Sequence, residues 1–80
     1  MSTTQTYPER VAAEVRAHLA RAGKDAGDLA AMLGVSRPTA SARWAGTQAY
    51  GLDELYAIAQ AIGVPVGALI ALPTEQLAAA

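Results

Sequence analysis

Eighty residues are enough for one small domain, and such a chain buries only about 60–65% of its unfolded surface. The sequence has no cysteine, which excludes a disulfide framework and a thiolate metal site. The longest apolar run is far shorter than the ~20 residues that span a bilayer, and the polar start is not that of a signal peptide. We therefore expect a small cytoplasmic protein with no membrane partner.

The formal net charge of −1 at first argues against a nucleic-acid partner. The charge is unevenly distributed, however: residues 1–43 carry six basic and four acidic side chains, whereas residues 44–80 carry three acidic side chains and no basic one. All positive charge thus lies in the first half of the chain. This asymmetry is compatible with DNA binding through one face.

The first predicted helix begins after Thr6, because Thr6 and Glu9 have the spacing of a capping box. Apolar residues then recur on one helical stripe, and Gly23 is expected to end the helix. The stripe consists of Val11, Ala12, Val15, Leu19 and Ala22.

The second predicted helix covers about residues 26–33, with Asp25 as its N-cap. Gly34 follows directly, and glycine is the usual residue of a left-handed helix C-cap. Only Val35 and Ser36 separate this glycine from the next helical pattern. The sequence therefore predicts a very tight turn at this point.

The third predicted helix covers about residues 37–45 and ends at Gly46. Ser36 is its expected N-cap, and Pro38 is tolerated in a first helical turn. Two helices joined by so short a turn form a helix-turn-helix unit, whose second helix fits the major groove of B-DNA. Sequence-specific binding of double-stranded DNA is therefore the leading hypothesis.

A fourth helix is predicted over about residues 52–62, with Gly63 as its stop, and a fifth opens at Pro65 and runs to about Ala71. Pro73 breaks the pattern. The predicted fold is an all-α, compact five-helix bundle with a helix-turn-helix. Its expected divisions are an N-terminal tail at 1–6, the DNA-binding domain at 7–72 and a C-terminal tail at 73–80.

The chain resembles the Cro and CI repressors of bacteriophages, also called the XRE family, over about residues 9–71. The resemblance implies a Cro-like protein or short immunity repressor that acts in the cytoplasm of a bacterial host cell and occludes a promoter by binding an operator. The matching features are Leu29-Ala30, Leu33-Gly34-Val35-Ser36, Thr39, Gly46, Leu52-Asp53-Glu54-Leu55, Ile58-Ala59 and Ala61-Ile62-Gly63-Val64.

Three positions depart from the usual family pattern. Many members have a phosphate-binding glutamine where this chain has Ala26, so its second helix offers less side-chain grip on the DNA backbone. Trp44 stands where many members have glutamate, and Tyr50 where many have proline.

Helical periodicity divides the third helix into two faces. Ala40 and Trp44 are four residues apart and are expected to pack inward, whereas Ala45 and most of the expected DNA-binding residues point outward. A lone tryptophan at this spacing is a core residue more often than a residue that stacks on DNA. The expected DNA-binding residues are Ser36, Arg37, Pro38, Thr39, Ser41, Ala42, Arg43, Thr47 and Gln48.

Arg37 is the strongest candidate for reading a base, because a guanidinium matches the O6 and N7 atoms of guanine. The alternative is a solvated surface arginine, although a cation at this position opposes the helix dipole. Pro38 and Ala42 fit a thymine methyl group, and the hydroxyls of Thr39 and Ser41 suit phosphates or bases.

Phosphate contacts are expected at the other end of the third helix. Arg43 either meets a phosphate or lies over Trp44 or Tyr50, whose hydroxyl is expected at the surface. The backbone amides of Thr47 and Gln48 and the Gln48 side chain are further phosphate candidates. Such contacts set the register on DNA and do not specify sequence.

No catalytic site, metal site, cofactor or small-molecule ligand is expected, because His18 is the only histidine and the carboxylates are scattered. The competing hypothesis is a protein-interaction module that binds a partner through its acidic, alanine-rich second half, or an antitoxin-like protein that binds DNA at one end and captures a toxin with its tail. A homodimer on two half-sites is the usual arrangement for one recognition helix per subunit. The apolar residues available for such an interface are Val66, Leu69, Ile70 and Leu77.

Overall fold

The computed structural model describes residues 5–71, and within this range the chain forms five α-helices and no strand. The predicted all-α fold is confirmed. The helices are α1 (Tyr7–Arg21), α2 (Ala26–Leu33), α3 (Arg37–Ala45), α4 (Leu52–Ile62) and α5 (Val66–Ile70). No helix in this range is both long and apolar enough to cross a membrane.

The predicted boundaries hold closely. Helices α2, α3 and α4 have the expected limits, while α1 ends at Arg21 and α5 is one residue shorter at each end than expected. Helix α1 ends before the expected stop at Gly23 because Ala22 is already the C-cap, and Gly23 has a positive φ of 75°. The expected C-terminal tail at 73–80 lies outside the described residues.

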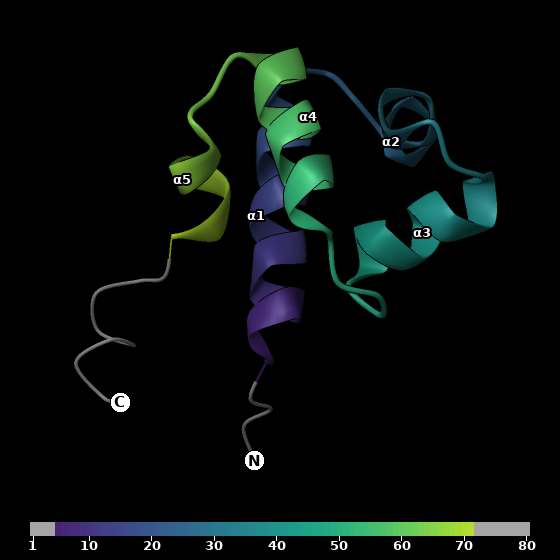
Figure 1. The fold of residues 1–80 in the computed structure, drawn as a ribbon, viewed down its shortest axis with the longest axis horizontal. Coiled ribbons are helices and arrows are strands. Elements are labelled where there is room, and N and C mark those ends of the chain that lie inside the picture. Colours follow the sequence, from purple (N-terminus) through teal and green to yellow (C-terminus); the bar gives the residue numbers. More distant parts are fainter. Residues whose placement is uncertain (1–4, 72–80) are drawn as a thin grey trace.

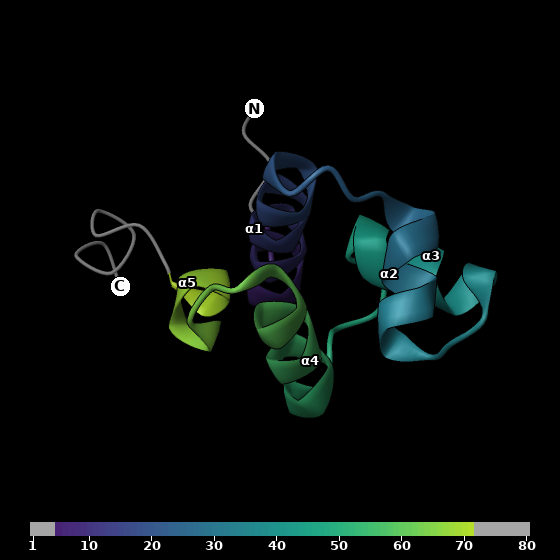
Figure 2. The same ribbon diagram turned by 90° about the horizontal axis from the view of Figure 1, so that it is seen from above.

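The helices are arranged in three groups around the core. Helices α2 and α3 lie on one side of α1 and α4, and α5 lies on the opposite side (Figures 1 and 2). Helix α3 packs against both α2 and α1, α2 also packs against α4, and α5 packs against α1 and α4. The helix-turn-helix therefore forms one lobe of the molecule, and α5 closes the core from the other side.

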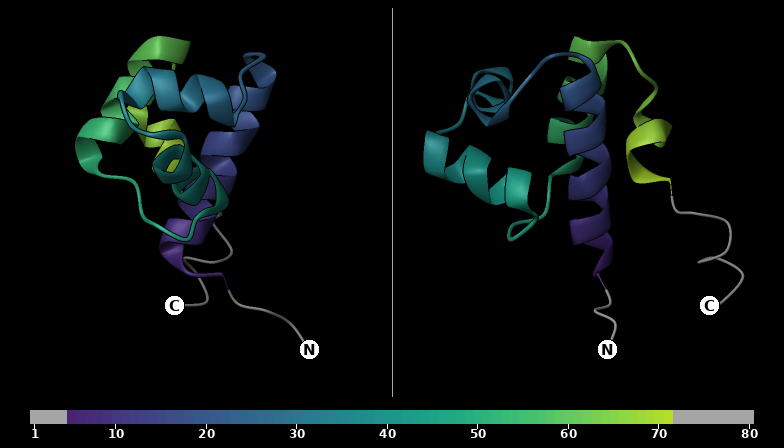
Figure 3. Two further views of the ribbon diagram at one scale, coloured as in Figure 1. Left: turned by 90° about the vertical axis from the view of Figure 1, so that its right-hand side faces the viewer. Right: turned by 180° about the vertical axis from the view of Figure 1, so that it is seen from behind.

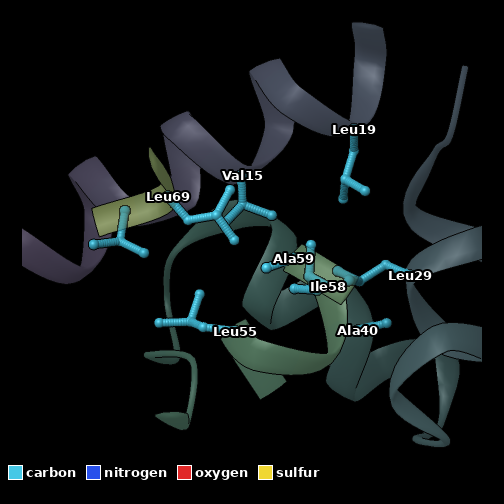
Figure 4. Packing of buried hydrophobic residues seen from close by; sticks show 9 residues of the cluster. Val15, Leu19, Leu29, Ala40, Leu55, Ile58, Ala59 and Leu69 are labelled. Carbon is cyan, nitrogen blue, oxygen red and sulfur yellow. The ribbon is translucent and has the colours of Figure 1, made fainter. Parts of the chain in front are cut away.

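Apolar side chains from all five helices meet in one core cluster (Figure 4). The predicted stripe of α1 is buried except at Ala22, which is exposed because it lies at the C-cap where the helix ends. The fully buried large side chains are Val15, Leu19, Leu29, Ile58 and Leu69.

The predicted capping residues are in place at the starts of the first two helices. The Thr6 hydroxyl accepts from the Glu9 amide, and the Glu9 carboxylate accepts from the Thr6 amide in return. Asp25 and Asp28 make the same reciprocal pair at the start of α2. These contacts satisfy amides that lack partners within the helices.

Candidate nucleic-acid interface

The turn between α2 and α3 has the geometry that the sequence predicts. Gly34 adopts the left-handed conformation with φ 66° and ψ 36°, and its amide donates to the Ala30 carbonyl. The Ser36 hydroxyl accepts from the Thr39 amide at 3.3 Å and so begins α3. The glycine reverses the chain and the serine starts the next helix, which sets α3 across α2 (Figure 3, left).

Helix α3 has one face in the core and one face open to solvent, as predicted. Ala40 is buried, and Trp44 packs partly buried against the core cluster. Thr39 and Ala42 are half-buried at the edges. The exposed side chains define what we call the outer face of α3: Arg37, Pro38, Ser41 and Ala45.

Arg37 is exposed, and its guanidinium lies beside the first turn of α2. A Cβ built on Gly27 would lie 3.4 Å from Nη2 of Arg37 and 3.3 Å from Oδ1 of Asp25. The Arg37 guanidinium therefore lies within contact distance of the Gly27 position. No hydrogen bond or ion pair fixes Arg37 to another residue of the range 5–71, so its guanidinium is available to a ligand.

The first turn of α2 is negatively charged. The backbone hydrogen bond from Asp28 holds the pKa of Asp25 below its usual value, and the nearby charge of Arg37 is one of the smaller causes. The carboxylates of Asp25 and Asp28 thus already accept hydrogen bonds from backbone amides at this helix end. This arrangement disfavours a phosphate at this helix end, where Ala26 also offers no side-chain hydrogen-bond donor.

Arg43, at the other end of α3, is held within the protein. Its Nε and Nη2 atoms donate to the two carboxylate oxygens of Glu54 at 2.8 and 3.3 Å, and its Nη1 atom donates to Oε1 of Gln48 at 2.5 Å. Neither expected role for Arg43, a phosphate contact or a position over Trp44 or Tyr50, includes this pairing. Sequence reasoning missed it because the partners are eleven residues apart and belong to different helices.

The ion pair also affects the loop between α3 and α4. Oε1 of Glu54 accepts the amide of Gly51 at 2.9 Å in addition to the arginine. The hydrogen bond from Arg43 lowers the pKa of Glu54, while the same bond raises the pKa of Arg43. Glu54 therefore joins the end of α3, the loop and the start of α4.

The backbone amides of Thr47 and Gln48 are already used. They donate to the Ala42 carbonyl at 3.0 and 3.3 Å, and the Thr47 hydroxyl donates to the same oxygen at 3.3 Å. The helix C-terminus takes these donors because its last carbonyls need partners. Any phosphate contact here would have to come from side chains, of which Gln48 keeps its Nε2 group as a donor.

The end of α3 is also attached to α1. Nη1 of Arg16 donates to the Trp44 carbonyl at 2.5 Å. Gly46 is buried with φ 90°, and an added Cβ would lie 3.2 Å from Cβ of Ala12 and 3.3 Å from Cα of Glu9. Only glycine fits both this backbone conformation and this space.

Tyr50 corrects an expectation from the sequence. Its hydroxyl is buried, with no hydrogen-bond partner among residues 5–71, rather than lying at the surface. Burial is the main reason that the pKa of Tyr50 rises to about 12. Tyr50 thus belongs to the packing around the Arg43–Glu54 pair.

Of the residues expected to form a homodimer interface, the three that the structure describes do not share one surface. Leu69 is fully buried in the core and cannot contact another subunit, whereas Val66 is exposed and Ile70 is half-buried. Leu77 lies outside the described residues. The helical period of a five-residue helix does not show from sequence which side faces the core.

Comparison with known proteins identifies the family. A sequence model described as Helix-turn-helix (HTH_3) matches residues 15–69, while no curated protein matches the chain. The fold is similar to the crystal structure of a hypothetical transcription factor, NHTF, from Neisseria, with a TM-score of 0.73 and 22% sequence identity over 100% of this chain and 95% of that one. Because the family model covers well over half of the chain, this protein belongs to the XRE-type helix-turn-helix family of DNA-binding regulators and is not an enzyme.

Proposed function

We propose that this protein is a sequence-specific regulator that places α3 in the major groove of an operator and represses transcription by occluding the promoter. The observation that carries the proposal is the outer face of α3: four exposed residues on a helix whose opposite side is in the core. A helix held in this way can enter a groove without rearrangement of the fold. The resemblance to phage Cro-type repressors supports the repressor role and a bacterial cytoplasmic setting.

Arg37 is the residue we assign to base reading. It lies at the start of α3, it is exposed, and its guanidinium has no fixed partner in the described part of the chain. Residues near the start of a recognition helix are the ones that reach base edges. Pro38 and Ser41 continue the same surface and suit apolar and hydroxyl contacts, with Ser36, Thr39 and Ala42 at its edges.

The test is DNA binding by the wild-type protein and by Arg37→Ala, with Arg21→Ala as the matched control. The control removes the same charge from an exposed site at the end of α1. We expect saturable binding to a selected duplex to weaken by about 1–3 kcal/mol in Arg37→Ala and to be nearly unchanged in Arg21→Ala. Equal losses in both variants would contradict a base-reading role.

One observation favours the alternative, a protein-interaction module. An apolar groove of about 340 Å³ lies between α1, α4 and α5, and one of its lining residues, Leu52, is 82% exposed. A partner protein or a second copy of the chain would cover such a surface. Substituting Leu52 with serine separates the two functions. It should weaken the binding of a partner that covers the groove and leave DNA binding unchanged, because a DNA contact through α3 does not require this groove in a monomer.

A further inference from the structure

The Arg43–Glu54 pair connects the recognition helix to α4 through a two-point contact. Both atoms on one edge of the guanidinium donate to the carboxylate, at 2.8 and 3.3 Å, and the third nitrogen donates to Gln48. The two side chains are 19% and 22% exposed. The pair is therefore well formed and largely shielded from solvent.

This contact has the geometry by which arginine binds a phosphate. A guanidinium edge recognises carboxylates and phosphates by the same two parallel hydrogen bonds. In this protein the carboxylate of Glu54 already occupies that edge, and the charges of the two groups cancel. An approaching phosphate would have to displace Glu54 before it gained an equivalent contact with Arg43.

We propose that Glu54 is a positioning residue that withholds the charge of Arg43 from DNA, so that α3 attracts DNA chiefly through Arg37 at its opposite end. The inference rests on the proposed DNA-binding function and defines which cation of the recognition helix takes part. Attraction to phosphates is independent of sequence, whereas base contacts discriminate between sequences. Pairing Arg43 internally therefore lowers binding to arbitrary DNA and leaves discrimination to Arg37.

The neighbouring residue offers a matched comparison. Asp53 precedes Glu54 in the first turn of α4, is exposed, and makes no ion pair with any residue from 5 to 71. Asp53→Asn and Glu54→Gln remove the same charge from the same helical turn. Only Glu54→Gln removes the carboxylate charge that neutralises Arg43, while its amide oxygen still offers an acceptor for the Gly51 amide and for Nε of Arg43.

The experiment measures binding to a duplex of random sequence by fluorescence anisotropy over a series of salt concentrations. For the wild-type protein we expect a slope of log K against log salt of about −3 to −5, and each additional phosphate contact steepens it by about 0.9. Glu54→Gln should show this steeper slope and tighter binding, whereas Asp53→Asn should keep the wild-type slope. Adding Arg43→Gln to Glu54→Gln should restore the wild-type slope.

Two results would overturn the inference. Equal slopes in Glu54→Gln and Asp53→Asn would show that only net charge matters. A slope that becomes shallower by about 0.9 in Arg43→Gln alone would show that Arg43 already contacts a phosphate in the wild-type complex. The single Arg43→Gln variant decides the matter even if circular dichroism shows that Glu54→Gln does not fold.

Failure of the proposed function gives a different pattern. If the wild-type protein and all four folded variants bind no duplex at any salt concentration, DNA binding itself is contradicted, and the inference with it. If the wild-type protein binds and its slope matches that of Glu54→Gln, the inference alone is overturned.

Discussion

The two ends of α3 carry one arginine each, and the surroundings of these two arginines differ. Arg37 at the N-terminal end is exposed and lies over a turn of α2 that lacks a side chain at Gly27. Arg43 at the C-terminal end is hydrogen-bonded to Glu54 and Gln48. Gly46, which ends the helix, packs closely against α1. We propose that the N-terminal end contacts DNA, whereas the contacts of the C-terminal end hold the helix in place.

This difference shows why a modestly charged helix can serve as a recognition element. A helix that reads DNA must be positioned accurately, and the positioning contacts need polar groups and close packing of their own. Here they are made at the C-terminal end of α3 by Arg43 and Gly46, and by Arg16 of α1, which donates to the Trp44 carbonyl. A count of basic residues therefore overestimates the charge that DNA meets.

The largest expected effect on stability comes from adding a side chain at Gly46, where the end of α3 packs against α1. Gly46→Ala forces a Cβ onto a residue with φ 90° and against Ala12 and Glu9, and we expect it to lower the free energy of unfolding by about 2–5 kcal/mol. Gly34→Ala is the matched control, because φ is also positive but, apart from the adjoining chain, no atom of residues 5–71 lies within 4 Å of the added Cβ. We expect about 1–2 kcal/mol for Gly34→Ala. Urea denaturation measures both, and equal losses would show that the contact with α1 contributes little.

The next effect comes from breaking the ion pair. We expect Arg43→Gln to lower the free energy of unfolding by about 1–3 kcal/mol, since it removes hydrogen bonds between charged, partly buried groups. Because the pKa of Glu54 is lowered in the folded state, the stability from the pair is present above the ordinary value of 4.5 and is lost as the pH falls below it.

The pH dependence of unfolding in the two proteins tests this assignment. Arg43→Gln should lose less stability than the wild-type protein between neutral pH and the acid range below 4.5. Asp25, whose pKa is also lowered, contributes in the same direction in both proteins and cancels in the comparison. Identical acid profiles would show that Glu54 does not depend on Arg43.

A smaller effect is expected at the open end, where Ser36 caps α3. Ser36→Ala should cost about 1 kcal/mol of stability because the Thr39 amide loses its acceptor. Ser36→Asp keeps an acceptor for the same amide but adds a negative charge beside the outer face of α3. We expect Ser36→Asp to retain stability and to lose DNA binding, and calorimetry with anisotropy would separate the two. Normal DNA binding by this variant would place the DNA elsewhere.

The smallest effect is expected at Tyr50. Tyr50→Phe removes a buried hydroxyl that has no hydrogen-bond partner in the described part of the chain, so we expect unchanged or slightly higher stability. The folded state disfavours ionisation of Tyr50, whose pKa is about 12, so this residue causes stability to fall as the pH rises above 10. Tyr50→Phe should reduce that alkaline loss. A clear drop in stability at neutral pH would show that the hydroxyl does have a partner.

The sequence by itself determined the helices and the turn. Capping residues such as Thr6, Asp25 and Ser36, and glycines such as Gly34 and Gly46, act on the residues next to them, so their effect is legible in the chain order. The division of α3 into a core face and an outer face follows in the same way, because the helical period is a local property.

Only the tertiary structure decided how the polar groups pair. Glu54 meets Arg43 because α4 returns beside the end of α3, and the Tyr50 hydroxyl is buried because the loop folds inward at that point. Pairings of this kind join segments that are distant in sequence, and they depend on how the helices pack rather than on any local pattern.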